Sequence, residues 1–432
     1  MGNILRAGFG KGIIHFAEEM LPLEGFCGIH DDPHIRLMVL KTGQEELAIL
    51  AAELVNIPKS AIARWRTQIA EAFAMEEQKV LIHMTHAITT PHEPGPMGPP
   101  DKRPEPSEED IRKKELFHAS IDAAAEEAII AARADFSEAR VGIGTGHCDV
   151  SVNRDIHTPF GWWIGARGEG ISNHTMTILK LEDLQGNTKG LLVSYGLKPC
   201  AVDNAGMREG IRLISSEVCG AFCRQMEEVY QAPTLYCMSA AANQVPYRTA
   251  LTEWVDEDGN VQQQDEGPER GFAYMDEVSR RMTKSARNIV DKISTAESAK
   301  PAGWKYVSFE WTRRKGGPRR LIRELTHTPD GSMEVRAEIF GLGEIAFVAV
   351  RPEVTAELEA ELLAGSPYTH TLLLSMTNGE MKYLPDERGF ALGTWEAQSS
   401  MLMPGGADRL LQEITDKLTE LLNDEVNKFK KV

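Results

Sequence analysis

Apolar residues in the first part of the chain switch between strand spacing and helix spacing. Residues 34–55 hold two apolar runs separated by a polar T-G-Q-E turn, which predicts a β-hairpin. Residues 58–75 place apolar side chains at helical spacing, and residues 79–84 form a short apolar run that predicts a buried strand. The dense prolines of 91–106 exclude a helix or a central strand, so we expect a loop directly after that strand.

The alternation of strands and helices continues to the end of the chain. A helix with a capping-box pattern is expected from Ser107 to about Ala132. Further strands are expected at 139–144, 174–182, 189–195, 233–239, 304–311, 333–340, 344–350 and 370–376, and further helices at 211–229, 275–297, 354–363 and 407–430. The predicted fold class is therefore α/β, with a mixed β-sheet core flanked by helices. No Pro/Gly/Ser-rich linker divides the chain, so we expect one domain over residues 1–432.

Three polar or glycine-rich regions interrupt this pattern. Residues 252–272 are polar and aperiodic, and predict a long surface loop or insertion within about residues 245–275. Glycine-rich pieces begin at Gly8 and Gly142 and predict turns, since neither has the G-x-G-x-x-G spacing of a nucleotide loop. The basic run 313–320 is centred on Gly-Gly-Pro and predicts either a solvated hairpin tip or a contact for an acidic ligand or a subunit.

Composition narrows the classes of partner. The chain has 47 Lys+Arg against 64 Asp+Glu, a net charge of −17. Such a surface repels phosphate backbones and anionic headgroups, so we expect no binding of nucleic acid or membrane. No apolar run reaches the roughly 18 residues that a membrane-spanning helix needs.

The predicted location is the cytoplasm. The N-terminal residues contain no apolar segment followed by a small-residue cleavage site, as a secretory signal would. The chain has 6 cysteines, none in a C-x-x-C pair, and reduced thiols are the simplest interpretation. We also expect a homo-oligomer, because enzymes of this size usually associate symmetrically.

Polar residues near the predicted strand ends are the candidates for chemistry. His86 and His92 follow the 79–84 strand and are placed to point into a cleft, where imidazole serves as metal ligand or general base. His30-Asp31 precedes a strand and either orients a ligand or caps a turn. Arg154 lies in a predicted loop beside two tryptophans, and either clamps a carboxylate or carbonyl or is a surface arginine.

Taken in order, short motifs along the chain resemble the N-terminal catalytic domain of neutral/alkaline, non-lysosomal ceramidases. The resemblance covers most of residues 6–430 and rests on the order of the motifs more than on any one of them. The matching pieces are Gly8-Phe9-Gly10, Gly28-Ile29-His30-Asp31, Thr85-His86 with Pro91, Asn153-Arg154, Tyr195 to Pro199, Pro352-Glu353, and Asn378-Gly379 with Tyr383 and Pro385. The resemblance implies a ceramidase-like α/β domain.

The resemblance also implies a zinc site, with one departure. In that family zinc is held by two histidines, a glutamate and a tyrosine, which fall here on His86, Lys198, Glu353 and Tyr383. A lysine ammonium donates hydrogen bonds and does not ligate a metal, so the implied ligands reduce to His86, Glu353 and Tyr383. Either these three still hold zinc, with His92 as a substitute, or Lys198 pairs with Glu353 in the place of the cation.

Three functions remain open at this point. The candidate catalytic residues are His86, Lys198 and Tyr383. The first function is hydrolysis of an amide or ester bond in a small polar substrate, with His86, Glu353 and Tyr383 holding a zinc ion. In it, substrate is bound by side chains near the site, namely Arg154, His30, Asp31 and His92. The second is a metal-free enzyme in which Lys198 acts as base or Schiff-base nucleophile. The third is a non-catalytic binding protein with a decayed site.

The location of the four residues carried over from the family makes a geometric prediction. Each of them lies at or after the end of a predicted strand, although they are spread widely along the chain. Ligands of open α/β sheets bind beyond the carboxyl ends of strands, so the four should converge there. The proline-rich 91–106 loop should then form a wall or lid.

Overall fold

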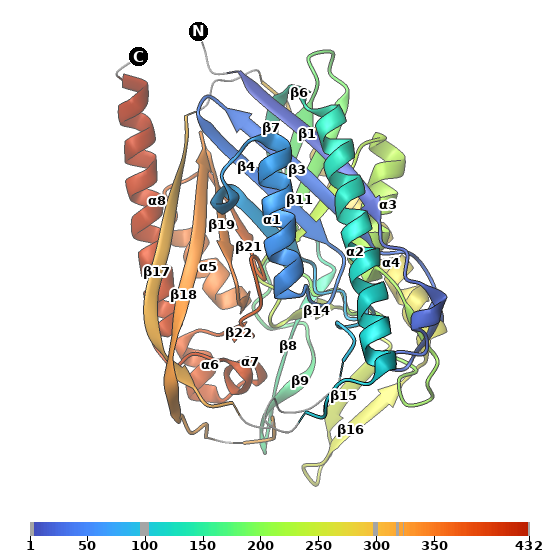
Figure 1. Ribbon diagram of the computed structural model, residues 1–432. Helices are drawn as coiled ribbons and strands as arrows, with labels where there is room; N and C mark the ends of the chain where they lie inside the picture. Colours follow the sequence, from blue (N-terminus) through green and yellow to red (C-terminus); the bar gives the residue numbers. More distant parts are fainter. Residues whose placement is uncertain (1–3, 96–102, 297–300, 317–318, 323, 431–432) are drawn as a thin grey trace.

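The computed structural model describes residues 4–95, 103–296, 301–316, 319–322 and 324–430. Three larger β-sheets pack together, and helices cover their outer faces (Figure 1). Phe9, Leu192 and Phe347, one from each sheet, belong to the same buried apolar cluster. Within the described ranges, no helix combines the length and the apolarity needed to cross a bilayer.

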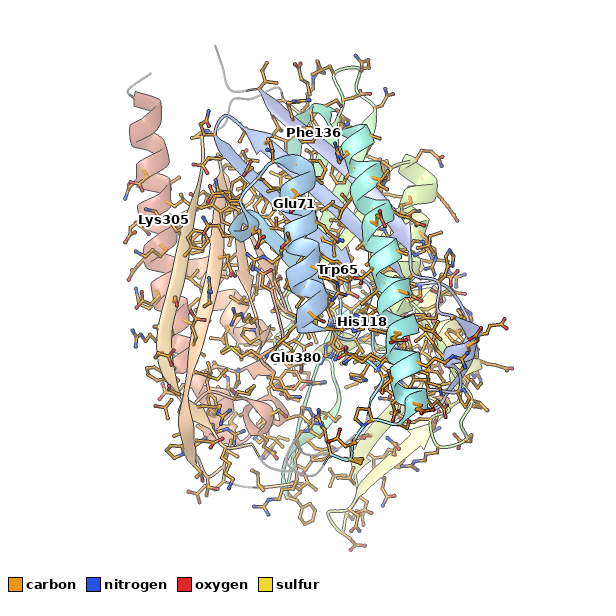
Figure 2. The ribbon with its side chains drawn as sticks, viewed as in Figure 1. Trp65, Glu71, His118, Phe136, Lys305 and Glu380 are labelled. Atoms are coloured by element: carbon orange, nitrogen blue, oxygen red, sulfur yellow. The ribbon has the colours of Figure 1, made fainter. Side chains whose placement is uncertain are left out.

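The first sheet has the strand order β5-β4-β3-β1-β6. Its strands are β1 Leu5–Ile13, β3 His34–Thr42, β4 Glu45–Ala52, β5 Val80–Met84 and β6 Ser137–Glu138. Helices α1 Lys59–Phe73 and α2 Glu108–Asp135 lie side by side across one face (Figure 1). Trp65 of α1 is buried and donates from Nε1 to Asp122 of α2 at 2.7 Å, and Figure 2 shows Trp65 beside the helix that carries His118. The predicted hairpin, strand and two helices of this region are confirmed.

The second and third sheets follow the same plan. The second, β13-β11-β10-β7, consists of β7 Arg140–His147, β10 Thr175–Glu182, β11 Thr188–Tyr195 and β13 Thr234–Met238, and is packed by α3 Glu217–Tyr230 and α4 Pro268–Val290. The third, β17-β18-β19-β21, consists of β17 Ala302–Arg314, β18 Pro329–Leu342, β19 Ile345–Val350 and β21 His370–Leu374, and is packed by α5 Ala356–Gly365 and α8 Gly406–Lys430. Each sheet contains one parallel pair beside antiparallel ones, namely β4–β5, β11–β13 and β19–β21. The α/β class with mixed sheets is therefore confirmed.

Shorter elements connect the sheets and carry polar groups to their ends. They are η1 Glu18–Met20, η2 Glu77–Lys79, β2 Phe26–Ile29, β8 Ser151–Thr158, β9 Gly161–Arg167, β12 Arg212–Ile214, β14 Gln244–Pro246, β20 Glu353–Val354, β22 Tyr383–Leu384, α6 Glu387–Leu392 and α7 Trp395–Ser399.

Three predicted elements differ from the structure. The stretch 252–272 is not a loop, because β15 Leu251–Val255 and β16 Val261–Asp265 form a hairpin and α4 begins at Pro268. Asp256 closes the hairpin turn by accepting from the backbone N–H groups of Asp258 and Asn260, which is turn chemistry within a polar sequence. The helix expected at 211–229 begins only at Glu217, after β12. The helix expected at 275–297 ends at Val290, and residue 297 lies outside the described residues.

The glycine-rich pieces are strands, so the prediction of turns is wrong. Gly8 and Gly10 lie in β1, where a Cβ on Gly10 would stand 1.9 Å from the carbonyl oxygen of Ala128 in α2. Gly142 lies in β7, where a Cβ would stand 2.4 Å from the carbonyl oxygen of Ser294. Glycine is required at these positions because neighbouring backbone packs directly on the strands, and not because of a positive φ.

Candidate functional site

Four polar side chains leave separate strands and meet at one place. His86 follows β5 by two residues, and Lys198 follows β11 by three residues. Glu353 opens β20 and Tyr383 opens β22, and these two short strands pair in parallel with Glu353 opposite Tyr383. The backbone of His86 has φ +58°, a left-handed conformation that turns the chain sharply at the strand exit. The structure thus brings together the four residues that were expected to converge.

Lys198 lies at the centre of this group. It is buried, and its Nζ donates to Glu353 Oε2 at 3.0 Å and to the Tyr383 hydroxyl at 3.2 Å. The ammonium also lies 3.0 Å from Glu353 Oε1.

His86 faces the other side of the same carboxylate. Its Nδ1 lies 3.5 Å from Glu353 Oε1, within ion-pair range. Both atoms are buried, and neither has a hydrogen-bond partner within the part of the chain that the structure describes. Because Nδ1 is turned toward Glu353, Nε2 is the ring nitrogen left for chemistry in the cavity.

The charges of this group stabilise one another. Burial alone would lower the pKa of Lys198, but the Glu353 carboxylate and then Tyr383 outweigh burial, so that this pKa is raised. For Glu353, burial acts to raise the pKa, and the nearby Lys198 and His86 lower it to about 2. At neutral pH the pair is therefore an ammonium and a carboxylate.

Arg154 completes one wall of the site, although not from a loop as expected. It lies within β8, and its Nε donates to Glu396 Oε1 at 2.9 Å. Its guanidinium carbon stands 5.4 Å from the centroid of the Tyr383 ring. Burial opposes the charge, but Glu396 and then Tyr383 raise the pKa of Arg154 well above its ordinary value. Arg154 is therefore a fixed cation that is already paired, and it supports Tyr383 from one side.

Two cavities meet at this group of side chains. The larger, about 870 Å³, is lined by Lys198, Arg154 and Asp203 among others, and the smaller, about 450 Å³, by Glu353 and Arg314 among others. His86, Tyr383 and Arg319 line both. These volumes suit small-molecule ligands.

Two solved structures have a similar fold over nearly the whole of this chain. Neutral ceramidase from Pseudomonas aeruginosa matches with a TM-score of 0.70 and 14% sequence identity, over 96% of this chain and 74% of its own. A ceramidase complexed with C2 matches with a TM-score of 0.70 and 15% identity, over 98% of this chain and 76% of its own.

The chain has the neutral ceramidase fold.

No protein-family model and no curated protein sequence matches it, so the likeness lies in the fold.

Zinc, which the ceramidase resemblance implies, does not fit the side chains at this point of the fold. The Lys198 ammonium stands against both Glu353 and Tyr383, and a metal ion sharing those oxygens would face a positive charge at contact distance. Among the described residues, no group of three or more His, Cys, Asp or Glu side chains is arranged to hold a metal. The expected ligand set of His86, Glu353 and Tyr383 is therefore corrected, because only His86 and Glu353 of it are ordinary zinc ligands and Lys198 is already paired with Glu353.

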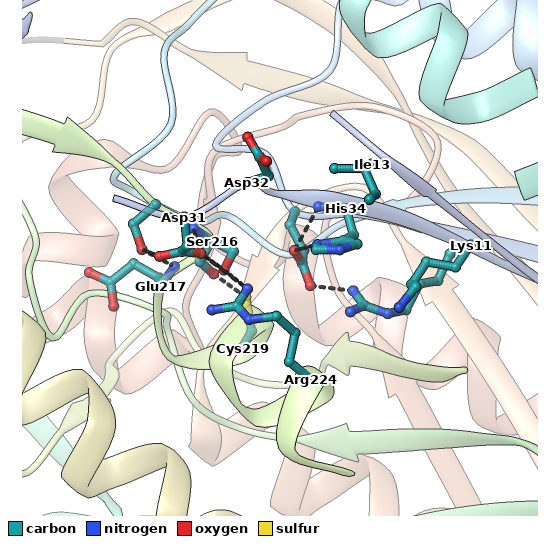
Figure 3. Close-up of polar contacts among 12 residues, drawn as sticks. Lys11, Ile13, Asp31, Asp32, His34, Ser216, Glu217, Cys219 and Arg224 are labelled. Carbon is teal, nitrogen blue, oxygen red and sulfur yellow. Dashed lines mark hydrogen bonds and ion pairs between the residues drawn. The ribbon is translucent and has the colours of Figure 1, made fainter. Parts of the chain in front are cut away.

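His30 and Asp31 lie outside the site and organise the start of α3. The Asp31 carboxylate accepts from the backbone N–H of Ser216 at 3.0 Å and lies 3.1 Å from Arg224, contacts that Figure 3 shows. His30 stacks on Phe272 with ring centroids 3.6 Å apart. Neither residue lines the cavities at His86, so the turn-capping alternative describes their position.

His92 also lies apart from the cavities. Its Nδ1 contacts Glu24 at 3.0 Å, and half of its side chain is exposed. Pro94, Gly95 and Pro106 of the same loop line a separate hollow against α2. Residues 96–102, on which the expected lid also depends, lie outside the described residues.

The site contains residues that the sequence reasoning missed. Asp203 is half-buried beside the larger cavity, and the removal of its carboxyl from water raises its pKa to about 6. Trp395 lines the same cavity and carries the Arg319 guanidinium 4.1 Å above its ring centroid. The basic run 313–320 was the available signal for Arg319, whereas no local motif marks Asp203 or Trp395.

Proposed function

We propose that this protein hydrolyses an amide or ester bond of a small polar molecule, with the Lys198 ammonium in place of a metal ion. The observation that carries the proposal is the contact of Lys198 with both Glu353 and Tyr383 at a cavity that His86 also lines. The likeness to ceramidases supports amide hydrolysis as the reaction class.

Tyr383 and Lys198 supply the electrophilic side of the reaction. The Tyr383 hydroxyl accepts a hydrogen bond from Lys198, so its own proton is free to be donated to a substrate carbonyl oxygen. The ammonium behind the hydroxyl stabilises the negative charge that develops on that oxygen during attack. In this role Lys198 has to stay protonated, which its pairing with Glu353 favours.

His86 and Glu353 supply the basic side. With Nδ1 held toward Glu353, His86 Nε2 takes a proton from a water molecule as the water oxygen attacks the carbonyl carbon. The same imidazole then gives that proton to the leaving nitrogen or oxygen as its bond to carbon breaks. Glu353 orients the ring and stabilises the transient imidazolium, and Glu353 itself stays ionised.

The charged groups of the larger cavity favour a polar substrate over a long-chain lipid. The cavity is lined by apolar side chains such as Ile88, Ile164, Met207 and Leu251, and also by charged and amide side chains, among them Asp203, Asn204, Arg248, Glu253 and Gln263. A hydrocarbon chain in this space would remove those groups from water without offering hydrogen bonds in return. A Schiff base at Lys198 is less well supported, because the ion pair with Glu353 disfavours the neutral amine that such a reaction requires.

The test is hydrolysis of a panel of N-acetyl amino acids and p-nitrophenyl esters, with Lys198→Met as the deciding variant. We expect Lys198→Met to lower kcat/KM by about 10²–10³-fold, the effect of removing one stabilising group from an oxyanion site. The matched control is Lys189→Met, which removes another buried lysine, paired with Asp135 at 2.8 Å and away from both cavities. Equal activity of the Lys198→Met and Lys189→Met proteins would contradict the proposal.

A further inference from the structure

The smaller cavity has an unusual charge balance. Each carboxylate that lines it already has a cationic partner within ion-pair range, and the pairs are Arg313–Asp330, Lys382–Glu380 and Lys198–Glu353. Two further guanidinium groups, those of Arg314 and Arg319, line the same space. Within the described residues, neither of them has a carboxylate within ion-pair distance. The cavity therefore carries positive charge that the protein leaves uncompensated.

Arg314 is fixed in place by backbone carbonyl groups. It is buried, its Nε donates to the carbonyl of Ser400 at 3.1 Å, and one terminal nitrogen donates to the carbonyl of Gln398. The second terminal nitrogen donates to no described group. Burial lowers the pKa of Arg314, and no described carboxylate offsets that effect. A buried guanidinium held only by neutral carbonyls is costly unless an anion completes its surroundings.

Two neighbouring features add to this arrangement. The Arg319 guanidinium carbon stands 4.1 Å over the centroid of the Trp395 ring, and within the described part of the chain its side-chain N–H groups donate no hydrogen bond. The Ser399 hydroxyl is buried at the same cavity, and it has no hydrogen-bond partner among the described residues. Guanidinium edges and a hydroxyl are the donors that proteins use for carboxylate and phosphate groups.

We propose that Arg314, Arg319 and Ser399 form a subsite for an oxyanion, so that the substrate carries a carboxylate or phosphate group beside its scissile bond. The part of this subsite in catalysis rests on the proposed hydrolase function. His86 and Tyr383 line the same cavity, so a substrate bound at the arginines would lie beside them. With its anionic end held by the arginines, a substrate would present its carbonyl to Tyr383. The cavity of about 450 Å³ accommodates the charged end of a small organic acid.

Direct binding of simple anions tests the subsite without any turnover. Titration calorimetry with inorganic phosphate and, separately, with acetate should show saturable binding to the wild-type protein. Arg319→Gln should weaken that binding by about 10- to 100-fold, the range for losing hydrogen bonds to a charged group. Arg319→Lys keeps the positive charge and loses the planar guanidinium. Its affinity for the anions should lie between those of the wild type and Arg319→Gln. Tighter binding of phosphate than of acetate would assign the subsite to phosphate groups. Tighter binding of acetate would assign it to carboxylates.

The matched control is Arg409→Gln. Arg409 also stacks on an aromatic ring, 4.2 Å from the Phe309 centroid, but it lies on α8 and lines neither cavity. The Arg409→Gln protein should bind both anions with the same affinity as the wild type. The subsite is overturned if neither anion binds the wild type, or if Arg319→Gln binds them equally well.

A second readout separates this inference from the hydrolase proposal. For an acyl amide that carries a free carboxylate and its neutral carboxamide analogue, the ratio of kcat/KM values should favour the acid, and Arg319→Gln should reduce that ratio by about 10- to 100-fold. Anion binding that depends on Arg319 in a protein without hydrolysis would sink the proposed function and leave the subsite standing. Hydrolysis at the same kcat/KM with and without the anionic group would sink the subsite and leave the proposed function standing.

Discussion

Two buried ion clusters in this protein look alike in charge and differ in what surrounds them. The cavity cluster consists of Lys198, Glu353, His86 and Tyr383. The enclosed cluster consists of Arg36, Glu53, His34 and Glu227. The labels of His34 and Lys11 mark its place in Figure 3. In each cluster a glutamate has its pKa lowered to about 2, with burial opposing the shift and Lys198 or Arg36 causing it.

The difference lies in the use of the oxygen atoms. Glu53 directs one oxygen at Arg36 and accepts from the backbone N–H of His34 at 2.7 Å with the other. Glu353 lines a cavity, and its buried Oε1, which lies 3.0 Å from Lys198 Nζ and 3.5 Å from His86 Nδ1, accepts no hydrogen bond among the described residues. A perturbed pKa therefore marks both clusters, and the adjoining cavities distinguish the candidate site.

The largest expected effect is on stability, in the enclosed cluster. Arg36→Met leaves Glu53 buried without its guanidinium partner, and leaves the half-buried Glu227 with Lys11 as its remaining cation. The variant should lower the free energy of unfolding by about 3–5 kcal/mol. Lys198→Met should lower it by less than half as much, because cavity water can solvate Glu353. Urea unfolding of both variants measures the difference. Equal losses would mean that the two clusters are not distinguished by access to water.

A third buried glutamate, Glu217, should respond to pH in the opposite direction from Glu53 and Glu353. Burial raises its pKa from 4.5 to about 7, against backbone N–H donors including Val202 at 2.8 Å. The folded state therefore binds this proton more tightly than the unfolded state. Its contribution to stability is complete below pH 4.5 and is lost as the pH rises through 7, a fall of about 3 kcal/mol.

Unfolding measured at pH 5 and pH 7 checks this sign. Wild-type protein should lose stability over that interval, with Asp203, whose pKa is about 6, adding to the loss. Glu217→Gln should reduce the slope, although the variant is less stable at both pH values because an amide cannot accept from all of those donors. An unchanged slope in Glu217→Gln would show that Glu217 is ionised throughout.

The next effect is on catalysis, in the cavity cluster. Glu353→Gln should lower kcat by about 100-fold, because His86 loses the carboxylate that holds its ring and stabilises its charged form. Glu53→Gln is the matched control in the enclosed cluster, and its kcat should match that of the wild type at a temperature where both are folded. Loss of kcat in both variants alike would remove the functional distinction between the clusters.

Much of the fold could be predicted because apolar spacing is a local signal. The hairpin at 34–55, the helix after Ser107 and most strands of the three sheets follow from it. The β15–β16 hairpin was missed because no residue of either strand is buried, and apolar and polar residues do not alternate along them. The strand that carries Arg154 was missed for a related reason, since its buried positions are filled by polar side chains such as Asn153 and Asp155.

Only the residues that follow predicted strands or belong to the ordered motifs of the candidate site could be predicted from the sequence. Those signals placed His86, Lys198, Glu353 and Tyr383 together, and the lysine at position 198 left zinc and the ammonium as alternatives. They could not show that His30 and Asp31 serve α3, or that Trp395 and Arg319 close the site. Such contacts join segments far apart in the chain, and no local pattern records them.

The central claim is that Lys198 provides the positive charge of the reaction without a metal ion. The most direct measurement is the rate of hydrolysis of the best substrate from the panel after exhaustive chelation, with metal content determined by elemental analysis. The account predicts that metal-free protein keeps its full rate and that added zinc does not raise it, while Lys198→Met remains about 10²–10³-fold slower under the same conditions. Activity that disappears with the chelator and returns with zinc would contradict it.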